Sequence, residues 1–406
     1  MLASLAWRNL WRQPHRTALS LISIVLASAI TIFLLALQTG GYGTMKESVL
    51  RLIDGFAQVQ PPGYAQDPDL RKTIANPKAL MARLDKDPGV TATTPRATTY
   101  VILSNGPRSY GAAVFGVDPL TETKISNLGT TIVKGRYLKP ADTGAAVIGA
   151  GLARNLKLSV GGKLTMLGGA SDGSVAADVL TVAGIFSTGA PEIDSQVVEM
   201  PLSRFQSDFA LEGRANTIAV TGHRLSNIQS NLAALRSTAD KHGLVLRAWT
   251  ELEPALHDVI LLDASFSSLI YISLVVIVVF IILNTLLMSV LERTREFGML
   301  MAIGMRPGQI GRMVWLELLF LAGMGAALGI ALGAGVTGWF AKHGIPFPGA
   351  EALFAQWHMP STLYPQLDYI SVLAGPLAIA LSICIAGFIP YARVRRLKPV
   401  SAMRAT

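Results

Sequence analysis

Long apolar runs fall at two places in this chain and constrain its fold more than any short motif does. One run covers 17–37, and three more cover 264–291, 313–340 and 369–389. Each has about 20 or more mostly uncharged residues, enough for a helix to cross a ~30 Å hydrocarbon core. Only 15% of all residues are charged, whereas soluble domains have about 25%. The sequence therefore predicts an α-helical membrane protein with four transmembrane helices, one near the start and three near the end.

Basic residues indicate which way these helices cross the membrane. They flank the first and fourth runs and separate the second from the third, whereas the loop after the third run has only Lys342. The flanking residues are Arg8, Arg12, Arg16, Arg293, Arg295, Arg306, Arg312, Arg393, Arg395, Arg396, Lys398 and Arg404. Because cytoplasmic loops are enriched in Lys and Arg, both termini are predicted to be cytoplasmic. This placement explains the net charge of +9, and no basic cluster interleaved with aromatics points to nucleic acid.

The same reasoning divides the chain into segments. They are 1–16, a cytoplasmic interfacial helix; 17–40, the first span; 41–262, an extracytoplasmic domain with stalk ends; 264–291, the second span; 292–312, a cytoplasmic loop; 313–340, the third span; 341–368, an extracytoplasmic loop; 369–391, the fourth span; and 392–406, a cytoplasmic tail. An alternative is a cleaved signal peptide ending near Ala27-Ser28-Ala29. The apolar run continues past it to Leu37, which is too long for a signal sequence.

The extracytoplasmic segment contains two β-α-β patterns that flank an insert. The first lies within 55–103 and the second within 214–250. Together they predict a split, ferredoxin-like α+β subdomain. The insert, 104–213, is rich in Gly and short β runs and predicts a small β subdomain. Helical spacing at 41–54 and 252–266 predicts stalks that continue from the first and second spans.

Motifs for catalysis or cofactor binding do not occur in the sequence. Gly161-Gly162-Lys163 is followed by Leu164 and lacks the upstream glycine of an ATP-binding P-loop. There is no His-Glu-x-x-His pattern, and the only cysteine is Cys384. We therefore expect no catalytic, cofactor-binding or metal residues, and a binding or conformational role rather than an enzyme.

The third span carries two local signals. Gly325, Gly329 and Gly333 recur at every fourth residue, a spacing of small residues that lets helices approach closely, within one protomer or between two. Glu317 lies near the predicted cytoplasmic end of the same span. An ionisable group there costs a few kcal/mol and usually has a partner. Two alternatives are open: Glu317 pairs with an arginine of the 293–312 loop, or it structures the end of the helix at the membrane interface.

The loop between the second and third spans has an amphipathic pattern. Phe297, Leu300, Met301 and Ile303 supply its apolar residues. A short amphipathic segment of this kind is typical of a helix that fits a groove on a partner protein.

Four motifs in order resemble the permeases of MacB/FtsX-type ABC transporters. Arg293-x-x-Glu296-Phe297-Gly298-x-Leu300-x-Ala302-Ile303-Gly304 is similar to their cytoplasmic coupling segment. Ala6-x-Arg8-Asn9-Leu10 resembles their N-terminal signature, Glu317 followed by the three glycines their third span, and 395–404 their C-terminal tail. The resemblance covers the whole chain, and the extracytoplasmic domain is most similar to the lipoprotein-releasing LolC/LolE group.

The resemblance implies a non-catalytic subunit in the bacterial inner membrane, with its large domain in the periplasm. Its partners would be separate ABC ATPase subunits, which bind the ATP and Mg, a second permease copy or paralogue, membrane lipids, and a periplasmic adaptor or lipoprotein chaperone. The residues expected to contact the ATPase are Arg293, Glu296, Phe297, Gly298, Leu300, Ala302, Ile303 and Gly304, and Tyr391–Arg404 adds contacts in this interpretation. ATP-driven motion would reach the periplasmic domain through the stalks.

Three functions remain open at this point. The first is release of a lipoprotein or another amphipathic substrate from the membrane. The second is export of a drug or peptide with an adaptor protein, and the third is FtsX-like signalling to a periplasmic hydrolase. A receptor or scaffold without an ATPase is the remaining alternative.

Overall fold

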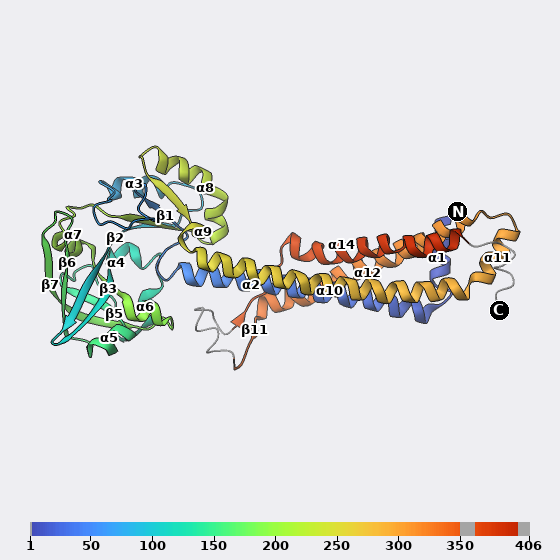
Figure 1. Ribbon diagram of the computed structural model, residues 1–406, viewed down its shortest axis with the longest axis horizontal. Coiled ribbons are helices and arrows are strands. Elements are labelled where there is room, and N and C mark those ends of the chain that lie inside the picture. The colour runs from blue at the N-terminus through green and yellow to red at the C-terminus, as the bar shows by residue number, and fades with distance from the viewer. Residues whose placement is uncertain (1, 350–361, 397–406) are drawn as a thin grey trace. The chain divides into compact units, whose positions relative to one another are not determined.

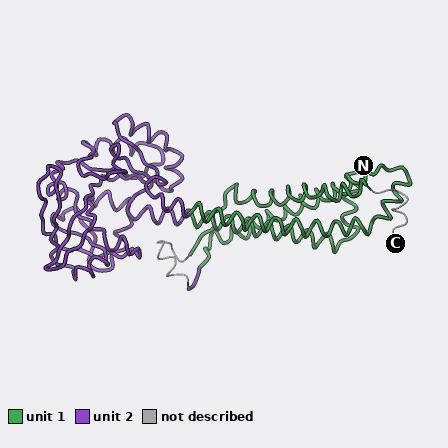
Figure 2. Tube along the Cα trace, in the orientation of Figure 1, with its two compact units in different colours: residues 1–42, 260–346, 362–406 green, residues 43–259, 347–361 purple. Residues whose placement is uncertain are grey.

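The computed structural model describes residues 2–349 and 362–396 of the chain. It forms two compact units (Figures 1 and 2). Unit 1 comprises Met1–Tyr42, Ile260–Pro346 and Thr362–Thr406, and unit 2 comprises Gly43–Val259 and Phe347–Ser361. Part of the predicted 341–368 loop and most of the predicted 392–406 tail lie outside the described residues.

Unit 1 is built on long helices. Its elements are α1 (Leu2–Leu10), α2 (Pro14–Leu50, which continues into unit 2), α10 (Pro254–Glu292, which begins in unit 2), α11 (Thr294–Ala302), α12 (Pro307–His343), β11 (Ile345–Pro346), β12 (Thr362–Leu363), α14 (Tyr369–Ala386) and α15 (Phe388–Arg395). Within the described residues, four helices are long and apolar enough to cross a membrane: α2, α10, α12, and α14 with α15. The predicted arrangement of one span, an α+β domain and three spans is therefore confirmed.

Local sequence explains where these helices begin and end. Proline is the first residue of α2, α10 and α12, a position where its missing N–H leaves no hydrogen bond unmade. Asp368 caps α14 by accepting a hydrogen bond from the Ser371 N–H at 2.7 Å. Gly344 follows α12 with φ of 74°, a conformation that glycine adopts readily.

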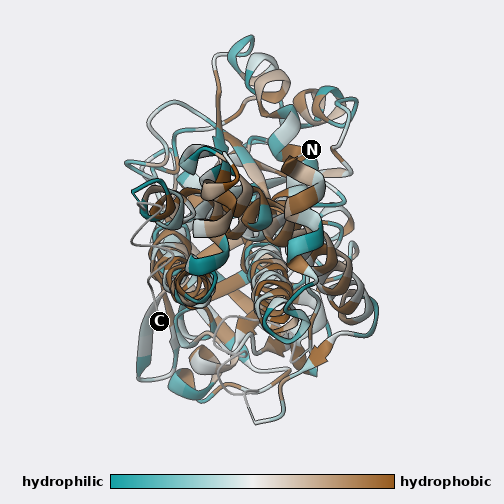
Figure 3. Cartoon of the chain, turned by 90° about the vertical axis from the view of Figure 1, so that its right-hand side faces the viewer, coloured by the Kyte–Doolittle hydropathy of each residue, from teal (hydrophilic) through white to brown (hydrophobic). Residues whose placement is uncertain are grey.

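The outer faces of the helices carry large apolar side chains. Phe266, Ile270 and Phe280 of α10 are 67%, 62% and 70% exposed, and Figure 3 shows much of the helical ribbon in brown, the colour of hydrophobic residues. In water such a surface would cost free energy. It suits helices that lie in a bilayer.

Most of each predicted stalk, 41–54 and 252–266, is helical and continuous with a span, while 51–54 and Glu253 lie outside the helices. Helix α2 passes through Gly40 and Gly41 to Leu50, and α10 begins at Pro254. Side chains join the two helices within unit 1: the Tyr42 hydroxyl donates to Asp263 Oδ2 at 2.5 Å, and the Tyr271 hydroxyl donates to Gln38 Oε1 at 2.9 Å. The Gln38 amide in turn donates to the Tyr42 oxygen at 2.7 Å. The two helices are therefore linked by a continuous chain of hydrogen bonds.

Unit 2 contains a mixed sheet with helices. Its elements are β1 (Ala57–Gln60), α3 (Pro77–Leu84), β2 (Ala92–Asn105), β3 (Arg108–Val117), α4 (Pro119–Glu122), η1 (Leu128–Thr131), β4 (Ile132–Gly135), β5 (Ala145–Gly149), α5 (Ala150–Leu156), β6 (Lys163–Gly169), β7 (Val175–Phe186), α6 (Pro191–Gln196), β8 (Val197–Pro201), α7 (Leu202–Asp208), β9 (Thr217–Thr221), α8 (Leu225–Asp240), β10 (Val245–Ala248) and α9 (Trp249–Leu252).

The strands from the two ends of unit 2 pair with one another. They lie in the order β10-β1-β9-β2, and α3 and α8 connect β1 to β2 and β9 to β10. All three pairings are antiparallel. Two β-α-β units that interleave in this way form the split arrangement of a ferredoxin-like sheet.

The insert shares this sheet rather than forming a sheet of its own. Strand β2 is the link, because 92–96 pair with β9 while 102–104 pair with β6. Strands β3, β8, β5, β7 and β4 continue the order beyond β2. A large apolar core under this part of the sheet includes Leu103, Val114, Leu180, Phe205 and Phe209.

Buried charges also lie in unit 2. Arg96 and Glu122 are 3% and 1% exposed and form a bidentate pair, with Nε and Nη2 of Arg96 donating at 3.0 and 2.5 Å. Glu199 on β8 accepts a hydrogen bond from the Tyr137 hydroxyl at 2.6 Å. Burial, followed by repulsion from Glu122, raises the pKa of Glu199 to about 8.

Glu199→Gln is expected to change how stability depends on pH. The folded protein binds the Glu199 proton more tightly than the unfolded chain, in which the pKa is near 4.3. The contribution of Glu199 to the free energy of unfolding is thus fully present below that value and is lost as the pH rises through about 8. Glutamine stays neutral and still accepts from Tyr137. We expect Glu199→Gln to raise the free energy of unfolding at pH 9 by at least about 1.4 kcal/mol, the equivalent of one pKa unit, and to change it little at pH 4.

Thermal unfolding of the full chain in a neutral detergent at both pH values measures this effect. Glu192→Gln is the matched control, because Glu192 is exposed at the start of α6. An equal effect of Glu199→Gln on the free energy of unfolding at pH 4 and pH 9 would contradict the raised pKa of Glu199.

Candidate functional site

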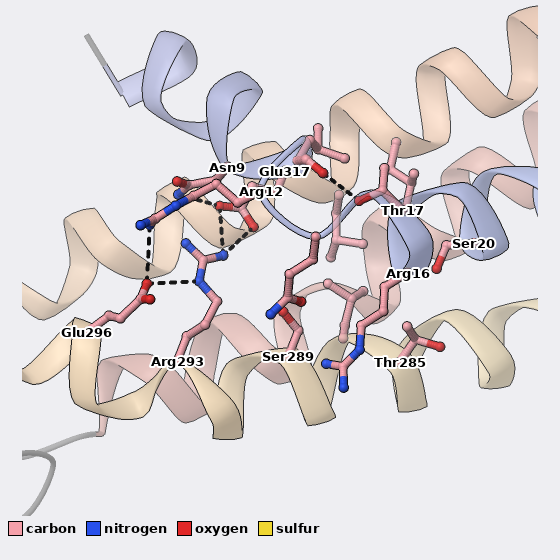
Figure 4. A pocket seen from close by; sticks show the side chains of 15 residues that line it. Asn9, Arg12, Arg16, Thr17, Ser20, Thr285, Ser289, Arg293, Glu296 and Glu317 are labelled. Atoms are coloured by element: carbon pink, nitrogen blue, oxygen red, sulfur yellow. Dashed lines mark hydrogen bonds and ion pairs between the residues drawn. The ribbon is translucent and has the colours of Figure 1, made fainter.

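A network of charged and polar side chains surrounds Glu317 of α12 (Figure 4). The Asn9 amide of α1 donates to Glu317 Oε1 at 2.8 Å, and Arg293 Nη1 lies 3.2 Å from Glu317 Oε2. Arg293 is the residue before α11 and also reaches Glu296 at 3.5 Å. Arg12, between α1 and α2, reaches Glu296 at 3.4 Å. We call these five residues the Glu317 network.

Burial makes the central pair of this network important for stability. The Arg293 and Glu317 side chains are each 12% exposed. Two buried opposite charges that hydrogen-bond well offset much of their desolvation cost, but removal of either one leaves the other uncompensated. The Arg293 guanidinium also lies over the Phe297 ring, 5.4 Å from its centroid. The pair thus fixes the start of α11 against α12, and Asn9 fixes α1 to the same carboxylate.

Helix α11 has one face packed against its own chain and another exposed. Phe297, Gly298 and Met301 are buried, and Phe297 and Met301 belong to an apolar cluster with residues of α1, α10, α12 and α15. Met299 of α11 is 51% exposed, and Ile303, the residue directly after α11, is 85% exposed. These two apolar side chains remain accessible at the surface of the protein.

The other residues predicted to contact an ATPase are divided between these environments. Leu300 is half-buried beside the apolar cluster, and Ala302 and Gly304 are exposed. Gly304 has φ of 103°, in the region that favours glycine. It ends α11 and turns the chain toward α12.

The three glycines of α12 face α2 of the same chain. A Cβ atom built on Gly325 or Gly329 would lie 2.5 Å from an atom of Ile24 or Ser28, and one on Gly333 would lie 2.9 Å from Ala29. Glycine alone permits this approach of the two helices. The close packing lies within one protomer, one of the two possibilities that the spacing leaves open.

Sequence reasoning missed two members of the Glu317 network, Asn9 and Arg12. The only available signal was the N-terminal signature that contains Asn9, which does not say what Asn9 contacts. Within the described residues, no group of three or more His, Cys, Asp or Glu side chains is arranged to hold a metal ion.

Two family models match the chain. Residues 268–399 match the FtsX-like permease C-terminal model. Residues 17–237, more than half of the chain, match the MacB-like periplasmic core domain. The chain belongs to the MacB/FtsX-like permease family. The resemblance drawn from four sequence motifs is thereby confirmed.

Individual relatives cover nearly all of this permease. LolC of Neisseria meningitidis, a lipoprotein-releasing system transmembrane protein, is 21% identical over 402 residues, which are 96% of this chain and 94% of that protein. LolE of Haemophilus influenzae, from a system with the same name, is 24% identical over 95% of this chain and 93% of that protein. MacB of Hyphomonas neptunium, a macrolide export ATP-binding/permease protein, is 26% identical over 98% of this chain, but the permease spans only 60% of that protein.

Proposed function

We propose that this permease is the membrane subunit of an ABC transporter and couples ATP hydrolysis by separate ATPase subunits to a conformational change of its extracytoplasmic domain. The family membership supports the permease role. The observation that carries the coupling mechanism is the Arg293–Glu317 pair, because it joins α11 to α12 through a buried contact. In this proposal both termini and α11 are cytoplasmic and unit 2 is periplasmic.

Force applied to α11 has a defined route into the helices. Arg293 transfers it to Glu317 of α12, and Asn9 transfers it to α1. The glycine contacts then connect α12 to α2, which continues without a break to Leu50 in unit 2. The chain supplies no ATP or Mg site in this proposal, since the partner ATPase binds both.

The substrate we propose is a lipoprotein or another amphipathic molecule, released from the membrane by two permease copies or paralogues acting together. LolC and LolE, each matched over more than nine tenths of its length, favour this class. The MacB similarity favours a second candidate, export with an adaptor protein. Stimulation of ATPase activity by purified lipoprotein would support release, whereas binding to a cell-wall hydrolase would support signalling.

Ile303→Asp is expected to reduce ATPase association at least tenfold. Ile303 is exposed, so a charge there removes apolar contact area from the docking face without opening a cavity in the core. The measurement is co-purification of the ATPase with the tagged permease from membranes.

Val133→Asp is the matched control for this experiment. Val133 is also an exposed β-branched residue, 58% accessible, but it lies on β4 of unit 2. We expect wild-type amounts of ATPase with this variant. The proposal is wrong if no ATPase associates with the wild type, or if Ile303→Asp retains it fully.

A further inference from the structure

A cavity of about 310 Å³ lies beside the Glu317 network, and residues of α2, α10 and α12 line it. Arg16, Thr17 and Ser20 face it from α2, and Thr285 and Ser289 face it from α10 (Figure 4). These residues recur at three- and four-residue intervals, so each set lies on one helix face. Short hydroxyl side chains where two membrane helices meet leave room for a ligand and supply polar atoms to bind it.

One arginine of the cavity is well placed to bind an anion. Arg12, Arg16 and Arg293 line the cavity together with Glu296 and Glu317. Glu292, just outside the lining, forms a bidentate pair with Arg16 at 2.5 and 2.6 Å. The Arg12 side chain is 64% exposed, and its ion pair with Glu296 is longer, at 3.4 Å. It is thus the cation best placed to turn toward a ligand.

The rest of the lining consists of two amide side chains, Asn9 and Gln13, and four leucines. The leucines are Leu10, Leu286, Leu318 and Leu321. A ligand in this cavity would therefore meet cations, hydroxyls and amides as well as leucine side chains. An amphipathic ligand can contact both kinds of group, whereas a small inorganic anion uses only the polar ones.

The position of α1 places the cavity at the level of lipid headgroups. Asn9 and Leu10 of α1 contribute to the lining, and Trp7 and Trp11 beside them are 42% and 52% exposed. Exposed tryptophans are typical of the membrane–water interface, and basic pockets between membrane helices bind anionic headgroups there.

We propose that this cavity binds an amphipathic phosphate ester, with the phosphate at Arg12 and the start of an apolar chain against Leu286. An anionic phospholipid is the source that uses both the polar and the apolar lining, and a soluble phosphate ester shares only the headgroup chemistry. Bound there, the lipid bridges the connection between α1 and α2 to α10. This inference does not depend on the proposed ATPase coupling.

Native mass spectrometry of the full chain in a neutral detergent tests the proposal. The probes are dioctanoyl phosphatidylglycerol, dioctanoyl phosphatidylcholine and glycerol 1-phosphate. We expect one phosphatidylglycerol to bind at least tenfold more tightly than either of the others. Equal binding of phosphatidylcholine would overturn the selection for an anion, and equal binding of glycerol 1-phosphate would overturn the lipid assignment in favour of a soluble ester.

Two variants locate the binding. Ser289→Leu fills the cavity and leaves every arginine in place, so phosphatidylglycerol affinity should fall at least tenfold. Ser273→Leu is the control, because Ser273 is exposed on the same helix and outside the lining, and it should bind like the wild type. Arg12→Gln removes this cation from an exposed position and should remove most of the preference over phosphatidylcholine. Wild-type affinity in both Ser289→Leu and Arg12→Gln would overturn the site.

Discussion

Glu317→Leu is expected to destabilise the permease by about 3 kcal/mol or more and to abolish its coupling to an ATPase. The substitution leaves the buried Arg293 with only the more distant and more exposed Glu296 carboxylate, at 3.5 Å, and breaking a buried ion pair costs about 3–5 kcal/mol. It also removes the acceptor of the Asn9 amide. Thermal unfolding in detergent measures the first effect, and ATPase activity of the assembled complex measures the second.

Two further variants separate charge from packing at this position. Glu317→Gln keeps an oxygen that can accept from Asn9 but loses the charge, so an intermediate loss is expected. In Glu317→Leu/Arg293→Leu both charges are absent, and part of the stability should return because residues in contact are not additive. Coupling should stay lost in the double variant. A fully additive double variant, or a Glu317→Leu protein as stable as the wild type, would contradict the role of the pair.

Gly329→Leu is expected to destabilise unit 1 by about 3 kcal/mol, at the upper end of the usual cost of overpacking. The first carbon of the new side chain would already lie 2.5 Å from Ser28 Cβ. Helices α2 and α12 must separate to admit it, and the contacts on both sides of Gly329 weaken as they do. The readout is thermal unfolding in detergent together with the yield of folded protein.

The same helix supplies the control for this prediction. A Cβ on Gly335 meets nothing within 4 Å, so Gly335→Leu should cost no stability. A smaller pair of variants tests the contact directly: Gly329→Ala should be rescued in part by Ser28→Gly, which removes the atom that clashes. Equal losses from Gly329→Leu and Gly335→Leu would show that the glycines matter for a reason other than their approach to α2.

Much of the architecture could be predicted because it depends on residues that are close in sequence. Apolar runs of sufficient length specify spans wherever they occur, and β-α-β patterns are visible within 55–103 and 214–250. The stalk helices followed from helical spacing that resumes after Gly41. In each case a local pattern determines the element, and the structure differs mainly at the boundaries.

Features that depend on distant contacts could not be predicted in the same way. The cost of a charge in the membrane indicated that Glu317 has a partner, but neither Arg293 in particular nor Asn9, from the other end of the chain, could be chosen by spacing. The amphipathic pattern of this segment did not show which of its apolar residues pack against the rest of the protein. Phe297 of α11 is buried, whereas Ile303, directly after α11, is exposed. The insert was predicted as a small β subdomain, but its pattern could not show that its strands share a sheet with the rest of unit 2, because this depends on β2 being long enough to belong to both halves.

The strand order of unit 2 has a consequence for how the protein is made. Strand β1 lies between β9 and β10, and Ala57 pairs with both Val220 and Ala248. During synthesis β1 therefore emerges long before either neighbour exists, and contacts this far apart in sequence form slowly. Until then its edges remain open to the wrong strands. A nascent chain stalled anywhere before residue 217 holds an incomplete sheet, which makes this interval the period in which it most needs protection from aggregation and proteolysis.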